Sequence, residues 1–176
     1  MVEQRALTIK GNNVGLLRAI VCDVLVSTPF FEGIQNSTFP SIKVQGLWDT
    51  GATGSVITKR VADNLGIKPI GRTKVNHADG STETNVYLVN IVLPSNVTIN
   101  GVRVTEGKLT EVDVLIGMDV IRLGDFSITN FNGNTVATFR TPSCHEIDYV
   151  KIINDHNQRQ QIKKYLPQPK HKHRKR

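Results

Sequence analysis

The stretch of residues 47–55, Leu-Trp-Asp-Thr-Gly-Ala-Thr-Gly-Ser, constrains this chain more than any other part of it. An apolar strand runs directly into Asp49, and a hydroxyl residue, a glycine and further small residues follow. A carboxylate at the end of a buried strand is held at the surface of a cleft. Gly51 lets a second backbone approach closely, and Thr50 can hydrogen-bond to the backbone of the turn. The pattern favours a chemically active carboxylate, and an ordinary Asp-Thr-Gly turn is the alternative.

Two later segments favour the functional interpretation. Residues 112–121 form a second apolar strand that ends at Gly117 and continues into a short amphipathic segment. Between this strand and the first one, residues 73–82 predict a β-hairpin with Asp79-Gly80 at its tip. The order along the chain is therefore strand, Asp-Thr-Gly, hairpin, apolar strand and glycine.

This order resembles the retropepsin family of retroviral-type aspartic proteases, here in a cellular, bacterial, single-lobe form. The likeness covers roughly residues 18–140. It implies an all-β acid-protease lobe, a closed and orthogonally packed barrel-like domain with a flap hairpin and one or two short helices. The resemblance further implies that Asp49 is the catalytic residue and that Thr50, Gly51 and Ala52 complete the active-site loop.

The resemblance also gives roles to the hairpin and to the second apolar strand. The hairpin would be a flap that closes over an extended peptide, although a plain surface hairpin is the alternative, and its polar tip differs from the glycine-rich, apolar flaps of the viral enzymes. The second strand would pack beneath the catalytic loop and support the substrate pocket, with a purely structural place in the core as the alternative for Ile116. The candidate residues are His77, Ala78, Asp79 and Gly80 in the flap, and Leu115, Ile116 and Gly117 at the pocket.

Hydrolysis by paired carboxylates needs two of them, because two like charges about 3 Å apart cannot both ionise and so share one proton. The chain contains no second Asp-Thr-Gly or Asp-Ser-Gly. We therefore expect a two-fold homodimer in which each subunit supplies one Asp49, as the resemblance also implies. Thr50 would then reach across to the other subunit, and Gly51 would present its backbone to the substrate. Neither a cofactor nor a metal ion is implied.

Three side chains near the predicted catalytic loop have other expected roles. Trp48 alternates with Asp49 along the strand, so it should face the opposite side and pack in the core. Asp113 is a candidate for the edge of the substrate pocket. Asp119 is expected to cap the short helix that follows Gly117.

Turn residues divide the rest of the first part of the chain into short strands, which is typical of an all-β domain. A helical turn at residues 59–65 should be closed by Gly66. The expected pairs are a hairpin or two strands at residues 7–10 and 16–27, a hairpin within residues 97–104 that turns at Asn100-Gly101, and a hairpin of residues 126–130 with 135–139 around Asn132-Gly133.

A change in composition divides the chain into a protease-like domain at residues 1–143 and a basic extension at residues 144–176. The formal net charge of +7 comes from the last part of the extension, because residues 157–176 hold eight basic and no acidic residues, and residues 1–156 hold 14 basic and 15 acidic residues. Residues 145–166 predict a polar helix, and the tail beyond it, including residues 171–176, is expected to be disordered.

These features predict an aspartic-type endopeptidase that acts as a homodimer on extended polypeptides. The alternative is a weak or inactive protease-like dimer that binds protein or nucleic acid through its tail, by contacts of residues 159–176 with an anionic polymer. His171 and His173 are too few to form a metal site. Without a run of about 20 apolar residues or a disulfide framework from Cys22 and Cys144, we expect a cytoplasmic protein with no membrane contact.

Overall fold

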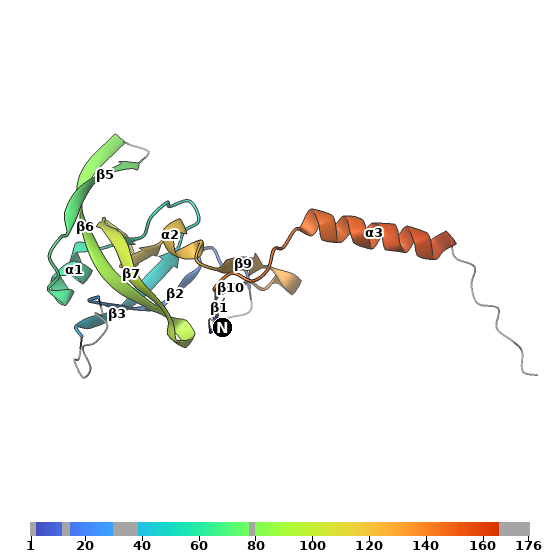
Figure 1. Ribbon diagram of the computed structural model, residues 1–176, viewed down its shortest axis with the longest axis horizontal. Coiled ribbons are helices and arrows are strands. Elements are labelled where there is room, and N and C mark those ends of the chain that lie inside the picture. The colour runs from blue at the N-terminus through green and yellow to red at the C-terminus, as the bar shows by residue number, and fades with distance from the viewer. Residues whose placement is uncertain (1–2, 12–14, 30–38, 78–79, 166–176) are drawn as a thin grey trace, which may run out of the picture. The chain divides into compact units, whose positions relative to one another are not determined.

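The computed structural model describes residues 3–11, 15–29, 39–77 and 80–165 (Figure 1). It divides the chain into two units, Met1–Cys144 and His145–Arg176. Two groups of predictions lie outside the described residues, namely the disordered tail at residues 171–176 and the placement of Ala78 and Asp79.

The first unit is built from two β-sheets, which confirms the all-β prediction. The larger sheet has seven strands in the order β2 (Val21–Ser27), β3 (Ser41–Trp48), β8 (Val114–Ile116), β4 (Val56–Ile57), β7 (Val97–Glu106), β6 (Gly80–Leu93) and β5 (Gly71–His77). Because β2 also pairs with β6, six of these strands form a ring and β5 lies outside it. The ring is irregular, since β4 has two residues and the β2–β6 ladder joins three residue pairs.

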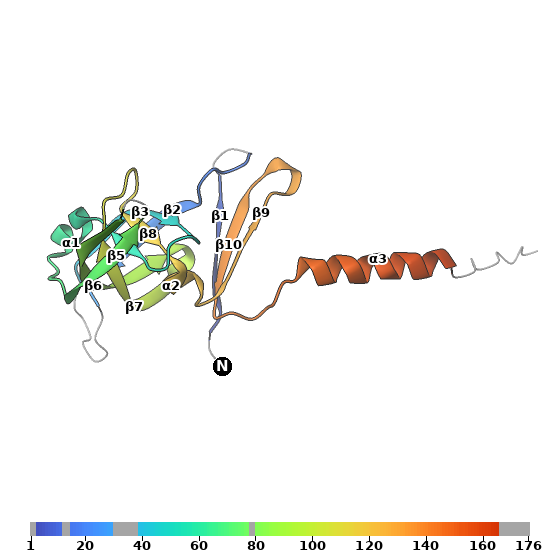
Figure 2. The ribbon, with the colours of Figure 1, turned by 90° about the horizontal axis from the view of Figure 1, so that it is seen from above.

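The second sheet contains three strands in the order β1 (Arg5–Lys10), β10 (Val136–Thr141) and β9 (Asp125–Thr129). It stands beside the ring of the first unit (Figure 2). The hairpin of β9 and β10 confirms the prediction around Asn132-Gly133. Of the two alternatives for residues 7–10 and 16–27, the structure has two separate strands and no hairpin, because β1 pairs along its whole length with β10. This register places the buried Leu7 and Ile9 beside the buried Phe139 and Ala137.

The predicted hairpin at Asn100-Gly101 is wrong. Strand β7 continues through this dipeptide, and its pairing with β6 shifts between Val89 and Ile91. Two residues of β7 thus lie opposite Asn90, which is the arrangement of a β-bulge. Gly101 adopts a positive φ of 65°, and its backbone N–H donates to the buried Asn90 Oδ1 at 2.9 Å. The turn signal therefore bends a strand and does not reverse it.

The core follows from the alternation of strand residues. Every second residue of β2 is buried, and β3 buries Val44, Gly46 and Trp48 in the same way. Trp48 stacks on Phe126 of β9 with 5.0 Å between ring centroids and lies tilted against Phe139 at 5.1 Å. Its indole N–H donates to the sulfur of Cys22 at 3.3 Å. Trp48 therefore packs in the core as predicted and joins the two sheets.

The helices of the first unit are short. Helix α1 (Lys59–Leu65) ends at Gly66 in a left-handed conformation, as predicted. Helix α2 (Met118–Ile121) has one turn, and single 3₁₀ turns occur at η1 (Pro94–Asn96) and η2 (Phe131–Gly133).

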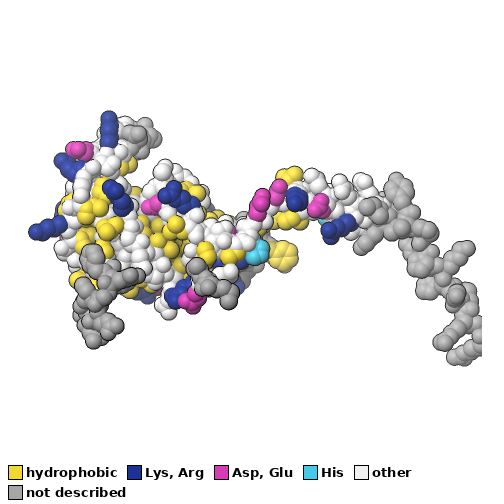
Figure 3. Space-filling model, viewed as in Figure 1, with side chains coloured by type: hydrophobic (Ala, Val, Ile, Leu, Met, Phe, Trp, Pro, Cys, Tyr) yellow, Lys and Arg dark blue, Asp and Glu magenta, His cyan; other side chains and the backbone are white. Residues whose placement is uncertain are grey.

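The second unit contains helix α3 (Tyr149–Tyr165). This helix begins later than the predicted residue 145, because the Asp148 carboxylate accepts hydrogen bonds from the backbone N–H groups of Val150 and Lys151 and so caps the first turn. The helix exposes both charged and apolar side chains (Figure 3), among them Tyr149 and Val150. None of the described helices is long and apolar enough to cross a membrane.

Candidate active site

The Asp-Thr-Gly loop connects β3 to β4, and strand β8 lies between these two strands. Strand β8 pairs in parallel with β3 and antiparallel with β4. Two backbone hydrogen bonds attach the loop to the end of β8. The N–H of Asp49 donates to the carbonyl of Ile116 at 2.9 Å, and the N–H of Met118 donates to the carbonyl of Ala52 at 2.8 Å. The second apolar strand therefore holds the loop from beneath.

The Asp49 side chain lies half-exposed at the start of the loop. Its Oδ1 accepts a hydrogen bond from the backbone N–H of Gly51 at 2.8 Å, and this contact fixes the orientation of the carboxylate. Thr50 and Gly51 are both exposed, and Ala52 is half-buried. Among the described residues, the Thr50 hydroxyl has no hydrogen-bond partner within the chain.

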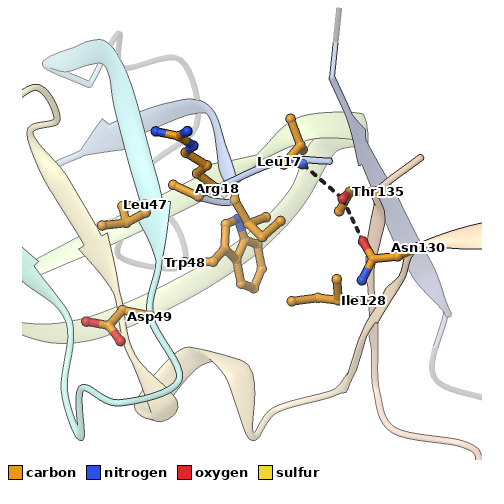
Figure 4. A pocket seen from close by; sticks show the side chains of 10 residues that line it. Leu17, Arg18, Leu47, Trp48, Asp49, Ile128, Asn130 and Thr135 are labelled. Atoms are coloured by element: carbon orange, nitrogen blue, oxygen red, sulfur yellow. Dashed lines mark hydrogen bonds between the residues drawn. The ribbon is translucent and has the colours of Figure 1, made fainter. Parts of the chain in front are cut away.

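A hollow of about 430 Å³ lies between Asp49 and the three-stranded sheet (Figure 4). Leu47 and Arg18 line one side of it, and Ile128 and Asn130 line the other. On that second side, Thr135 donates its hydroxyl proton to Asn130 and accepts the backbone N–H of Leu17 (Figure 4). A polar contact network thus supports the wall of the hollow on the side of the three-stranded sheet.

Asp119 does not cap helix α2, contrary to the prediction. The residue at the N-terminal cap is Gly117, and the Asp119 carboxylate binds Ser55 at the far end of the catalytic loop. It accepts the Ser55 hydroxyl proton at 2.7 Å and the Ser55 backbone N–H at 3.0 Å. The buried Ser55 Oγ in turn accepts the N–H of Gly117 at 3.0 Å. Ser55 had no predicted role. Its partner Asp119 is distant in the sequence, so no local pattern indicates this contact.

Gly117 lies against the backbone of the catalytic loop. A Cβ atom at this position would meet the carbonyl carbon of Gly54 at 2.6 Å and the carbonyl oxygen of Ala52 at 3.0 Å. The close approach explains why the apolar strand ends in glycine. Of the two residues before it, Ile116 is fully buried in the core and Leu115 is half-buried. The backbone of this strand therefore supports the catalytic loop directly. A contact of Leu115 with substrate stays a prediction.

The carboxylate of Asp113, the candidate for the pocket edge, is engaged within the fold, and a contact with substrate stays a prediction. It forms an ion pair with Arg60 of α1, whose Nε donates at 2.9 Å, and accepts the Thr58 hydroxyl proton at 2.9 Å. The pKa of Asp113 is lowered mainly by the hydrogen bond from Arg60. Desolvation of the carboxylate opposes this effect, and the hydrogen bond from Thr58 lowers the pKa further. Asp113 thus ties the base of β8 to α1.

This arrangement predicts a pH-dependent contribution to stability. A carboxylate whose pKa is lowered by folding stabilises the protein above its ordinary value of 3.8 and loses that effect as the pH falls through the lowered value. We expect Asp113→Asn to reduce the free energy of unfolding at pH 7 by about 1–2 kcal/mol. The difference should shrink in acid, as measured by urea denaturation at both pH values.

Asp63→Asn is the matched control, since Asp63 pairs with Lys59 in an exposed i,i+4 contact on the same helix. This variant should reduce the free energy of unfolding at pH 7 by less than Asp113→Asn does. An equal loss in the two variants, or a loss at Asp113 that is independent of pH, would contradict the assignment.

The flap hairpin is formed by β5 and β6, which pair from Gly71↔Val86 to His77↔Gly80. It projects from the ring of the first unit (Figure 1). The backbone of His77 ends β5, and the exposed Gly80 opens β6 with a φ of 128°. The hairpin is therefore present as predicted, and its closure over a substrate stays a prediction.

A second hollow of about 890 Å³ lies beside the hairpin, lined by Val75, Thr82 and Glu106 among others. The hydroxyl of the buried Tyr87 donates to Glu106 Oε2 at 2.6 Å. Burial, followed by this hydrogen bond, raises the pKa of Tyr87 to about 12. Tyr87 therefore stays protonated and holds the Glu106 carboxylate at the wall of this hollow. In the described part of the chain, no group of three or more metal-ligating side chains comes together.

The comparisons with known proteins concern mainly the part of the chain that contains the candidate active site. Residues 38–123, which include the catalytic loop, the hairpin and β8, match the family model of the gag-polyprotein putative aspartyl proteases. No curated protein sequence is similar enough to count as a match.

Solved structures similar to this chain include three proteases or protease-like domains. The retropepsin-like aspartic protease from Rickettsia conorii shares 14% identity at a TM-score of 0.48, covering 79% of this chain and 94% of that one. The EIAV protease, complexed with the inhibitor HBY-793, shares 20% at 0.44, with 62% and 90% covered. The retroviral protease-like domain of Ddi1 from Leishmania major shares 20% at 0.36, with 53% and 83% covered.

Proposed function

We propose that this chain, which matches the family model of the gag-polyprotein putative aspartyl proteases over residues 38–123, is an aspartic endopeptidase that acts as a homodimer on extended polypeptides. The observation that carries the proposal is the geometry of Asp49. Asp49 is half-exposed, its carboxylate is oriented by the N–H of Gly51, and its loop is held by β8 and by the Ser55–Asp119 contact. An ordinary surface turn needs no such support from two strands and a second carboxylate.

The proposed mechanism uses one Asp49 from each of two copies. The ionised carboxylate takes a proton from water, and the protonated one hydrogen-bonds to the scissile carbonyl, so that the water oxygen can attack the carbonyl carbon. Breakdown of the tetrahedral intermediate breaks the C–N bond and transfers a proton to the leaving amine. In this dimer Thr50, exposed in the single chain, would hydrogen-bond to the partner loop, and Gly51 would present its backbone to the peptide.

The hairpin supports an extended substrate. A peptide lying beneath β5 and β6 can add backbone hydrogen bonds along the hairpin, in the manner of an additional strand. We assign substrate contact to the flap residues His77, Ala78, Asp79 and Gly80. Leu115 is assigned to the pocket wall, while Ile116 and Gly117 support it from the core side.

The test is digestion of an unbiased peptide library with and without a statine-type inhibitor, which mimics the tetrahedral intermediate. We expect cleavage that the inhibitor abolishes. Because a monomer holds one Asp49, we also expect specific activity to fall on dilution, in parallel with dimer dissociation measured by sedimentation. An active protein that stays monomeric would contradict the shared dyad, and a protein that neither cleaves peptides nor binds the inhibitor would be a binding module.

A further inference from the structure

The hollow of about 890 Å³ is formed jointly by the hairpin and by the segment that follows the catalytic loop. Strands β5 and β6 line it with Val75, Thr82 and Thr84. Val56 of β4, which follows the catalytic loop directly, also lines it. Its volume is in the range of ligand-binding pockets, about 300–1,000 Å³. A peptide that lies beneath the hairpin and reaches Asp49 would therefore pass this hollow.

Glu106 supplies a fixed carboxylate at the wall of the hollow. The hydroxyl of the buried Tyr87 donates to its Oε2 at 2.6 Å, and the side-chain amide of Asn85 donates to the same oxygen at 3.2 Å. The Thr84 hydroxyl donates to the backbone carbonyl of Glu106 at 2.7 Å. Both donors to the carboxylate are neutral. They hold the half-buried Glu106 in place and leave its charge uncompensated.

The lysines of the hollow do not neutralise this carboxylate. Lys59 forms its ion pair with Asp63 at 2.6 Å. The hydrogen bond from Lys59 to Asp63 is the main cause that raises the pKa of Lys59, and the charge of Glu106 is the smallest of the causes. Lys108 also lines the hollow, and its side chain is exposed. Within the described part of the chain, Glu106 forms no ion pair.

The second glutamate of the hollow is in a different situation. Glu83 on β6 forms an ion pair with Arg72 on β5 at 3.3 Å, and their side chains are 63% and 62% exposed. This pair joins the two strands of the hairpin and lies largely in solvent, where an ion pair contributes little. Of the two glutamates, Glu106 is therefore the one that is held by the fold and offers an uncompensated charge.

We propose that Glu106 selects substrates with a lysine or arginine side chain, which enters the hollow and forms an ion pair with this carboxylate. The inference rests on the proposed function. The apolar stem of such a side chain can pack on Val56, Val75 and Leu109 while its charged end reaches the wall. Hydrogen bonds between charged groups are roughly twice as strong as those between neutral groups. A carboxylate that is oriented in advance also loses less entropy on binding.

The first test measures this preference through cleavage. In the digestion of an unbiased peptide library, lysine and arginine should be enriched at a position near the scissile bond. In one cleaved peptide, norleucine then replaces the lysine at that position, which keeps the stem and removes the charge. Glu106→Gln should lower the ratio of kcat/KM between the lysine and norleucine peptides more than roughly tenfold, because a hydrogen bond between charged groups is lost.

The controls separate selection from a structural role. Glu146→Gln is the matched control, because Glu146 is exposed in the second unit and lines neither hollow. It should leave the ratio unchanged. Glu106→Lys should reverse the preference, so that a peptide with glutamate at this position is cleaved faster than its glutamine counterpart. A purely structural role of Glu106 would lower the cleavage of all peptides alike. Circular dichroism checks the fold of each variant.

A binding experiment separates this inference from the proposed function. In the Asp49→Asn protein, fluorescence anisotropy compares a labelled pool of short peptides that each contain one lysine with the same pool carrying norleucine. We expect the lysine pool to bind more tightly, and the difference to disappear when Glu106→Gln is added.

Each outcome decides one of the two proposals. Cleavage without a preference for lysine or arginine, or a preference that survives Glu106→Gln, overturns the role of Glu106 and keeps the protease function. A protein that cleaves nothing but binds the lysine pool through Glu106 keeps that role and overturns the protease function. A protein that neither cleaves peptides nor distinguishes the two pools overturns both.

Discussion

Replacing Asp49 with asparagine is expected to lower peptide hydrolysis by at least roughly 10²–10⁴-fold, the usual contribution of a general acid–base group. One substitution removes both carboxylates of the proposed dyad, because each copy contributes the same residue. The effect on stability should be small, since the Gly51 N–H can still donate to the amide oxygen at the position of Oδ1. Steady-state kinetics on a cleaved library peptide measures the loss.

Asp63→Asn provides the control, because Asp63 is an exposed carboxylate on α1 that pairs with Lys59. It should leave the rate unchanged. Sedimentation of the Asp49→Asn protein should still show a dimer, which excludes dissociation as the cause of the loss. Peptide cleavage retained by a purified Asp49→Asn protein would contradict the assignment of Asp49 as the catalytic carboxylate.

Replacing Gly117 with alanine is expected to damage both activity and stability. The added Cβ would lie 2.6 Å from the carbonyl carbon of Gly54, a contact that backbone atoms cannot relieve without moving. Insertions of this kind into packed interiors cost typically about 1–3 kcal/mol. Because the atoms that must move belong to the loop that holds Asp49, we also expect a rate loss on the order of 10²-fold, as for displacements of about 1 Å.

Gly71→Ala is the matched control, since a Cβ atom at Gly71 meets nothing within 4 Å. Thermal unfolding and steady-state kinetics should detect no comparable change in that variant. If Gly117→Ala lost stability but kept its full rate, β8 would support the fold without positioning the catalytic loop.

Much of the local structure was predictable because its causes are local. Gly66 ends α1 in the left-handed conformation that glycine adopts most easily. The turn at Asn132-Gly133 joins β9 to β10, and Trp48 packs opposite Asp49 because side chains alternate along a strand. Each of these features depends on residues within a few positions of one another.

Other features depended on partners distant in the sequence. Asn100-Gly101 carries a strong hairpin signal, yet β7 remains continuous there because β6 pairs with it on both sides of the bulge. Asp119 is a residue type that often caps helices, but the cap position falls on Gly117, and Ser55, 64 residues away, offers Asp119 two hydrogen bonds. In both cases a tertiary contact outweighs the local preference.

The sequence by itself determined the all-β class and the order of loop, hairpin and apolar strand around Asp49, because composition, alternation and turn residues act over short distances. Only the tertiary structure decided that β1 pairs with β10 and that Asp113 binds Arg60. The physical reason is that strand pairing and ion pairing are chosen by the packing of the whole domain, and no short stretch of sequence contains both partners.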